Sequence, residues 1–147
     1  MKNLIPALLL LLSLGSQAQN TARIIDWKLL AKVDFIDKYH EEIEAWYLVP
    51  EFSKAVKDLE NQMVIIKGYT IPLDVEGGEY ALSAYPFSAC FFCGGAGPES
   101  VISLQFKGEA QRFKTDQVLH IKGKLHLNTE DFYDFPYILK ECEVIEK

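Results

Sequence analysis

The stretch QVLHIKGKLHL, residues 117–127, carries the pattern that decides the fold. Its apolar side chains fall on every second position, as they do on one face of a strand: Leu119, Ile121, Leu125 and Leu127. The positions between them are mostly polar and include His120, Lys122, Lys124 and His126. Gly123 interrupts the run at its middle, where a bulge or a sharp bend lets a strand curl round a barrel. The stretch therefore predicts a long strand that bends at Gly123.

Four further segments predict the strands that complete a sheet. Residues 63–71 (MVIIKGYTI) are rich in β-branched side chains and stop at Pro72, and a turn at residues 76–79 precedes the strand-like segment 80–85. The last two segments are residues 100–106 and 137–145. Five strands and one or two helices predict a mainly β (α+β) chain, folded as a small, partly open barrel of the oligonucleotide/oligosaccharide-binding (OB) type. A two-layer α+β sandwich is the alternative.

Two segments before this sheet predict helices. Asp26 is a suitable N-cap for a short helical turn over residues 27–30. Residues 50–61 (PEFSKAVKDLEN) begin with proline, end with asparagine and place their apolar residues at helical spacing. We expect this second helix to dock on the core through Phe52, Val56 and Leu59. Between the two, residues 32–37 alternate like a strand, although a helix fits that short segment nearly as well.

The N-terminus has the pattern of a secretory signal peptide. A short basic start at residues 1–3 precedes the apolar run 4–14, and the small residues near Ala18 predict cleavage after it. The run is too short for a comfortable membrane span. Gln19 stands where a lipoprotein would have cysteine, so we expect an exported, soluble product in the periplasm or the medium, with a retained signal anchor as the alternative. Residues 1–18 are then the signal peptide, and residues 19–147 form a single domain.

The charge balance limits the classes of partner. The chain carries 15 basic and 21 acidic residues, for a net charge of −6, and removal of the signal peptide takes away one more lysine. Negative charge disfavours nucleic acid and anionic membrane surfaces as ligands. For an exported protein we expect a partner such as an envelope protein or a transporter component.

The stretch CFFCGGAGPES, residues 90–100, predicts a thiol site in a loop between two strands. Cys90 and Cys93, three positions apart in a turn, can direct two thiolates at one ion, and zinc accepts sulfur readily in a tetrahedral site. Two sulfurs are half of such a site. The remaining ligands would come from other parts of the fold, and the candidates are His120, which is the best placed, Glu99, His126 and Cys142. The first functional hypothesis is therefore an accessory protein that binds zinc or copper.

Two other interpretations of the same cysteines stay open. In the first, one thiolate attacks a partner disulfide and its neighbour resolves it, although the glycines and Pro98 argue against the helix that a thioredoxin-like site requires. In the second, the loop is structural and the protein is a non-catalytic binding or interaction module. Cys142 is expected to be a buried, inert thiol. No nucleophile motif or HExxH zinc motif is complete, so the sequence does not predict an enzyme.

The residues GYTIPL (68–73) and YALSAYP (80–86), with Cys90 behind them, resemble a family of exported bacterial domains of unknown function. The resemblance covers about residues 27–145 in order. It implies an exported protein with a barrel-like fold and implies no reaction. The family's loop has a run rich in cysteine, histidine and proline, whereas this chain has Cys90, Cys93 and the run GGAGPE, so the resemblance extends a metal role to Cys90 alone.

Overall fold

The computed structural model of the 147-residue chain describes residues 21–42, 44–108 and 112–146. The predicted signal peptide lies outside these residues. No helix among the described residues is long and apolar enough to cross a membrane.

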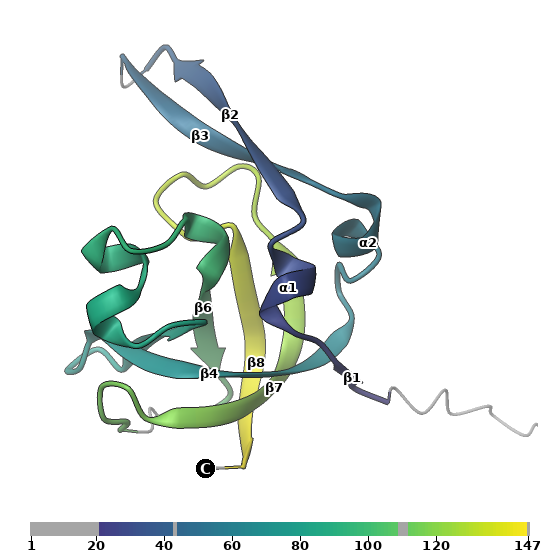
Figure 1. Cartoon of the computed structure of the whole chain (residues 1–147), viewed down its shortest axis with the longest axis vertical. Coiled ribbons are helices and arrows are strands. Elements are labelled where there is room, and N and C mark those ends of the chain that lie inside the picture. The colour runs from purple at the N-terminus through teal and green to yellow at the C-terminus, as the bar shows by residue number, and fades with distance from the viewer. Residues whose placement is uncertain (1–20, 43, 109–111, 147) are drawn as a thin grey trace, which may run out of the picture.

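Five strands form a barrel, as the alternating pattern predicted. They are β4 (Met63–Asp74), β5 (Glu79–Ser83), β6 (Val101–Phe106), β7 (Val118–Leu127) and β8 (Tyr137–Glu146). β4 pairs with both β5 and β7, β5 with β6, and β8 with both β6 and β7, so the pairings run round a complete ring. The β6–β8 pair is parallel and the other four are antiparallel. This mixed order is that of an OB-like barrel (Figure 1).

The irregularity predicted at Gly123 is found as a shift in the pairing of β7 with β8. Leu119, Ile121 and Leu125 of β7 are fully buried, and the register with β8 shifts between Lys122 and Lys124. A Cβ atom at Gly123 would lie 2.7 Å from Cγ of Leu139 on β8, so this position needs glycine for the two strands to approach. The extra residue of the bulge belongs to β8, where Glu141 has a φ of 54°.

The segment before the barrel differs from prediction. The capped turn α1 (Trp27–Leu30) forms as expected, with the Leu29 amide donating to Asp26 Oδ1 at 2.8 Å. The predicted helix over residues 50–61 is wrong at both ends, because α2 spans only Lys54–Lys57. Residues 50–52 instead belong to β3 (Ala45–Phe52), which pairs along its whole length with β2 (Val33–His40). The expected contacts with the core survive, since Phe52, Val56 and Leu59 are all buried.

The β2–β3 hairpin, residues 33–52, is here called the arm. It forms a separate two-stranded sheet that projects beyond the barrel, with α1 and α2 near its base (Figure 1). A two-residue strand β1 (Arg23–Ile24) adds to β4 in parallel. β4 itself continues past Pro72, where the sequence predicted its end. Its pairing with β5 shifts register between Pro72 and Asp74, so the strand accommodates the proline.

The core has two parts. The larger fills the barrel and the base of the arm, and includes Leu30, Phe52 and Tyr137. The smaller lies under the cysteine loop and consists of Ile71, Ala81, Cys90 and Val101, with Phe91 and Phe135 packed against it. This second cluster anchors the loop that the sequence predicted as the functional site.

Candidate functional site

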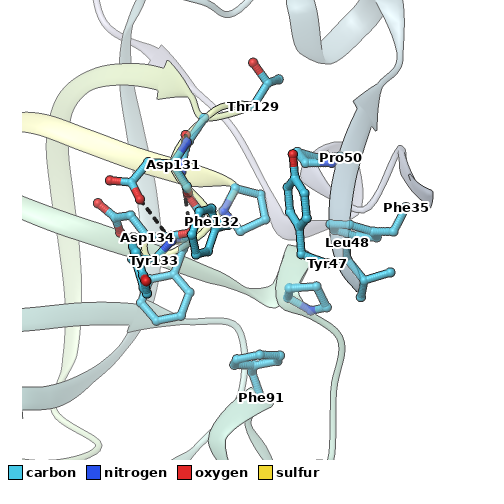
Figure 2. Close-up of a pocket in the computed structure, with 14 residues that line it drawn as sticks. Phe35, Tyr47, Leu48, Pro50, Phe91, Thr129, Asp131, Phe132, Tyr133 and Asp134 are labelled. Atoms are coloured by element: carbon cyan, nitrogen blue, oxygen red, sulfur yellow. Dashed lines mark hydrogen bonds between the residues drawn. The ribbon is translucent and has the colours of Figure 1, made fainter. Parts of the chain in front are cut away.

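A pocket opens where the arm, the cysteine loop and the β7–β8 loop meet (Figure 2). Its volume is about 300 Å³. The arm contributes Phe35, Tyr47, Leu48 and Pro50; the cysteine loop contributes Phe91 and Pro98; and the β7–β8 loop contributes residues 128, 129 and 131–136. A concave, mostly apolar site lined by separate segments is the usual form of a binding site.

Asn128 holds the β7–β8 loop in shape. Its side chain is buried, and its amide nitrogen donates to the carbonyl oxygens of Asp131 at 2.6 Å and Phe135 at 3.1 Å. Its Oδ1 atom accepts from the backbone amides of Glu130 at 3.2 Å and Asp131 at 3.0 Å. One side chain thus satisfies backbone groups along the whole turn, so the pocket wall is preformed.

Aromatic contacts join the three segments. Phe132 of the β7–β8 loop lies with its ring centroid 5.3 Å from His40 and 5.5 Å from Tyr47 of the arm. The ring centroid of Phe135, from the same loop, lies 6.2 Å from that of Phe91 in the cysteine loop. Such edge and tilted ring pairs stabilise an arrangement beyond the area that they bury. The rings therefore fix the width of the pocket.

The carboxylates of Asp131 and Asp134 bond to backbone amides within the β7–β8 loop. Oδ1 of Asp131 accepts from the Tyr133 amide at 2.9 Å, and Oδ1 of Asp134 accepts from the Phe135 amide at 2.8 Å. In Figure 2 both side chains lie on the side of the loop away from Tyr47 and Leu48. No lysine or arginine is among the described residues that line the pocket. The cavity is thus suited to an apolar, uncharged group.

The cysteine loop places its two thiols in opposite environments. It is built from three short 3-10 turns: Phe87–Ala89, Phe91–Cys93 and Pro98–Ser100. Cys90 is buried, and its thiol donates to the carbonyl oxygen of Phe87 at 3.1 Å, whereas Cys93 is exposed. Gly94 has a φ of 69°, and a Cβ atom on Gly95 would lie 2.6 Å from the carbonyl oxygen of Ala89. The glycines are thus required by the tight path of the chain.

The two predicted histidine ligands lie on β7, outside the cysteine loop, whereas Glu99 belongs to the last turn of that loop. His120 is on β7, in register with Lys67 of β4 and with Glu146 of β8. His126 contacts Glu60 at 3.0 Å, and Glu99 packs over Gly97. Within the part of the chain that the structure describes, no three histidine, cysteine or acidic side chains gather so that they could hold a metal ion. The zinc or copper site at Cys90, Cys93, His120 and Glu99 stays a prediction, which elemental analysis of the purified chain and of a Cys90→Ala/Cys93→Ala variant tests.

The predicted burial of Cys142 is confirmed. It is buried on β8, and its thiol donates to the carbonyl oxygen of Leu139 at 2.9 Å. Burial raises the pKa of this thiol to about 12, which suppresses the reactive thiolate at neutral pH.

The three thiols should therefore differ in reactivity. In the reduced, folded protein at pH 8, Ellman's reagent is expected to titrate one thiol quickly, Cys93, because Cys90 and Cys142 are buried. All three should react in urea. The matched variant Cys93→Ser should lose the fast phase, and two fast thiols in the folded wild type would contradict the burial of Cys90.

The sequence did not point to the aromatic residues of the pocket. Phe35, Phe91 and Phe132 are far apart in the chain and meet only through the fold. The signal that could have located one wall is the run NTEDFYDFP, residues 128–136, in which turn-forming Asn and Asp residues alternate with aromatic ones.

Comparison with known proteins bears on the fold. No family model and no curated protein matches the sequence. A crystal structure of a DUF3299 family protein from Pseudomonas aeruginosa PAO1 matches with a TM-score of 0.54 and 17% identity, over 86% of this chain and 97% of that chain. At this identity the likeness shows the fold alone. The chain thus shares its barrel architecture with a protein of a family of unknown function.

Proposed function

We propose that this protein is a non-catalytic binding module whose ligand site is the aromatic pocket. The observation that carries the proposal is the set of rings that three separate chain segments place around one cavity of about 300 Å³. The wall formed by the β7–β8 loop joins the fourth and fifth strands of the barrel, and OB-like barrels use this connection to bind ligands. The arm lies across the pocket from this loop, and the cysteine loop contributes a third wall through Phe91 and Pro98 (Figure 2).

The lining defines the class of ligand. Aromatic and aliphatic side chains dominate it. Asp131 and Asp134 also line it, but Figure 2 shows their side chains on the side of the loop away from Tyr47 and Leu48. The ligand group is therefore an uncharged aromatic or aliphatic moiety, on a small molecule or on a polypeptide side chain. On the pattern of residues 1–18 we place this binding function outside the cytoplasm.

A titration with small matched probes tests the proposal. Benzyl alcohol, followed by amide chemical shifts in NMR spectra, is expected to shift the signals of residues around Phe91 and Phe132 in a saturable way. Benzoate should bind more weakly, because the pocket offers no cation among its described lining residues. Phe132→Ala should abolish the shifts, whereas Tyr85→Ala, which removes an exposed ring outside the pocket, should not.

The result that would contradict the proposal is equally direct. If benzyl alcohol causes no saturable shift in the wild type, or if the shifts persist in a folded Phe132→Ala variant, the pocket is not the binding site. Near-identical amide spectra away from residues 128–136 and from the arm, which Phe132 contacts, show that the variant is folded.

A further inference from the structure

The arm exposes large apolar side chains that the barrel does not cover. Ile36, Tyr39 and Trp46 are between 45% and 69% exposed. Tyr39 and Trp46 are direct partners across the two strands, with ring centroids 5.4 Å apart. Aromatic residues exposed together on a projecting element are typical of a protein contact surface.

The arm is also strongly acidic. Residues 33–52 contain six acidic residues and one basic residue, Lys38; the acids are Asp34, Asp37, Glu41, Glu42, Glu44 and Glu51. All six are exposed, and none forms an ion pair with another described residue. Asp34 and Glu51 are direct partners across the strands, an arrangement of like charges that destabilises a hairpin. A cation that lies between them relieves this repulsion.

The arm offers unpaired backbone along its edges. Its sheet contains two strands, so among the described residues each has a pairing partner on one side only. β2 runs through eight residues without proline, whereas β3 is interrupted by Pro50. An unpaired strand edge accepts a further strand through main-chain hydrogen bonds. The outer edge of β2 is therefore the better template.

We propose that the arm docks an extended polypeptide segment of a partner protein that alternates lysine or arginine with large apolar side chains. The segment adds as a third strand along β2, places its apolar side chains against Tyr39 and Trp46, and brings its cations to Asp34 and Glu51. The arm of a second copy does not fit, because it would bring another acidic surface against the first. Trp46, Asp34 and Glu51 are not among the described residues that line the aromatic pocket, so variants at these positions test the inference separately from the proposed pocket function.

Selection from phage-displayed random dodecapeptides on the immobilised protein tests the inference. Peptides with net positive charge and alternating apolar residues should be enriched. The dissociation constant of a synthetic copy of an enriched peptide should rise about tenfold or more in Trp46→Ser, in line with the loss of a central aromatic anchor. It should rise similarly in Asp34→Asn/Glu51→Gln, and added salt should weaken binding to the wild type.

Two surface variants outside the arm serve as matched controls. Tyr85→Ser and Glu143→Gln remove an exposed ring and an exposed charge from other elements, and they should leave the affinity unchanged. Thermal unfolding measures whether each variant is folded. The inference is overturned if no peptide is enriched, if the enriched peptides are neutral or acidic, or if folded arm variants bind as the wild type does. A dimer seen by sedimentation and lost in Trp46→Ser would assign the surface to a second copy and would also overturn it.

Discussion

Replacing Tyr137 with alanine is expected to lower the free energy of unfolding by about 3–5 kcal/mol, the range for removing a large aromatic side chain from a core. Tyr137 is fully buried at the start of β8, and its ring centroid lies 5.4 Å from that of Phe52 at the base of the arm. Its hydroxyl donates a 2.6 Å hydrogen bond to the carbonyl oxygen of Leu30, at the end of α1. The substitution therefore removes a contact that joins the N-terminal segment to the barrel. Urea unfolding followed by circular dichroism measures the loss.

Tyr137→Phe separates the ring from the hydroxyl. It keeps the packing and leaves the Leu30 carbonyl oxygen without its partner, so a smaller loss of about 1–3 kcal/mol is expected. Burial, and secondarily the negative charge of Glu99, raises the pKa of Tyr137. A phenol whose pKa is raised in the folded state contributes fully to the free energy of unfolding at a pH below its unfolded pKa of about 10. This contribution is lost as the pH rises further. Above about pH 10 the wild type should thus lose stability faster than Tyr137→Phe, and equal pH slopes would contradict the burial of the hydroxyl.

Replacing Asn128 with alanine is expected to cost about 2–3 kcal/mol of unfolding free energy and to abolish binding in the pocket. The substitution removes both the donors and the acceptor that hold the turn, and it leaves backbone groups of residues 130–135 without partners. Phe132 and Phe135 then lose their fixed positions. The stability is measured by urea unfolding, and the binding by the benzyl alcohol titration.

Two comparisons sharpen this result. Glu130→Ala alters an exposed neighbour on the same loop that does not line the pocket, and it should leave both stability and binding near the wild-type values. Asn128→Asp keeps the acceptor atom and loses the amide donors, so it should also disrupt the turn. If Asn128→Ala binds benzyl alcohol as the wild type does, the loop does not depend on this side chain and the account of the pocket wall is wrong.

The barrel could be predicted from the sequence because its strands bury one face and expose the other. Residues 119, 121, 123 and 125 of β7 are buried while the residues between them are more exposed, and a period of two is the strongest signal that a sheet leaves in a sequence. The same rule failed for β3. Phe52, Val56 and Leu59 meet one core, and a helical spacing describes them well even though Phe52 reaches that core from a strand. Local pattern records which residues are buried more reliably than the backbone that buries them.

The candidate site was harder to predict for a related reason. The cysteine loop was placed correctly between two strands, because Cys90, Cys93 and the glycines are close together in the chain. A third metal ligand and a binding pocket both depend on which distant segments meet. Phe132 contacts Tyr47 only because the arm leans over the β7–β8 loop, and no periodicity encodes that contact.

The base of the arm has a consequence for how this architecture can change. The chain leaves and re-enters the body at neighbouring points, since the Ser53 amide donates to the Lys32 carbonyl oxygen at 3.1 Å and Val33 pairs directly with Phe52. Insertions or deletions between residues 33 and 52 therefore change the length of the arm without shifting a barrel strand, as is usual where two chain ends lie together at the surface. The sequences of the barrel and of the arm can therefore change at different rates. Core packing constrains the barrel, and the partner that the arm binds constrains the arm.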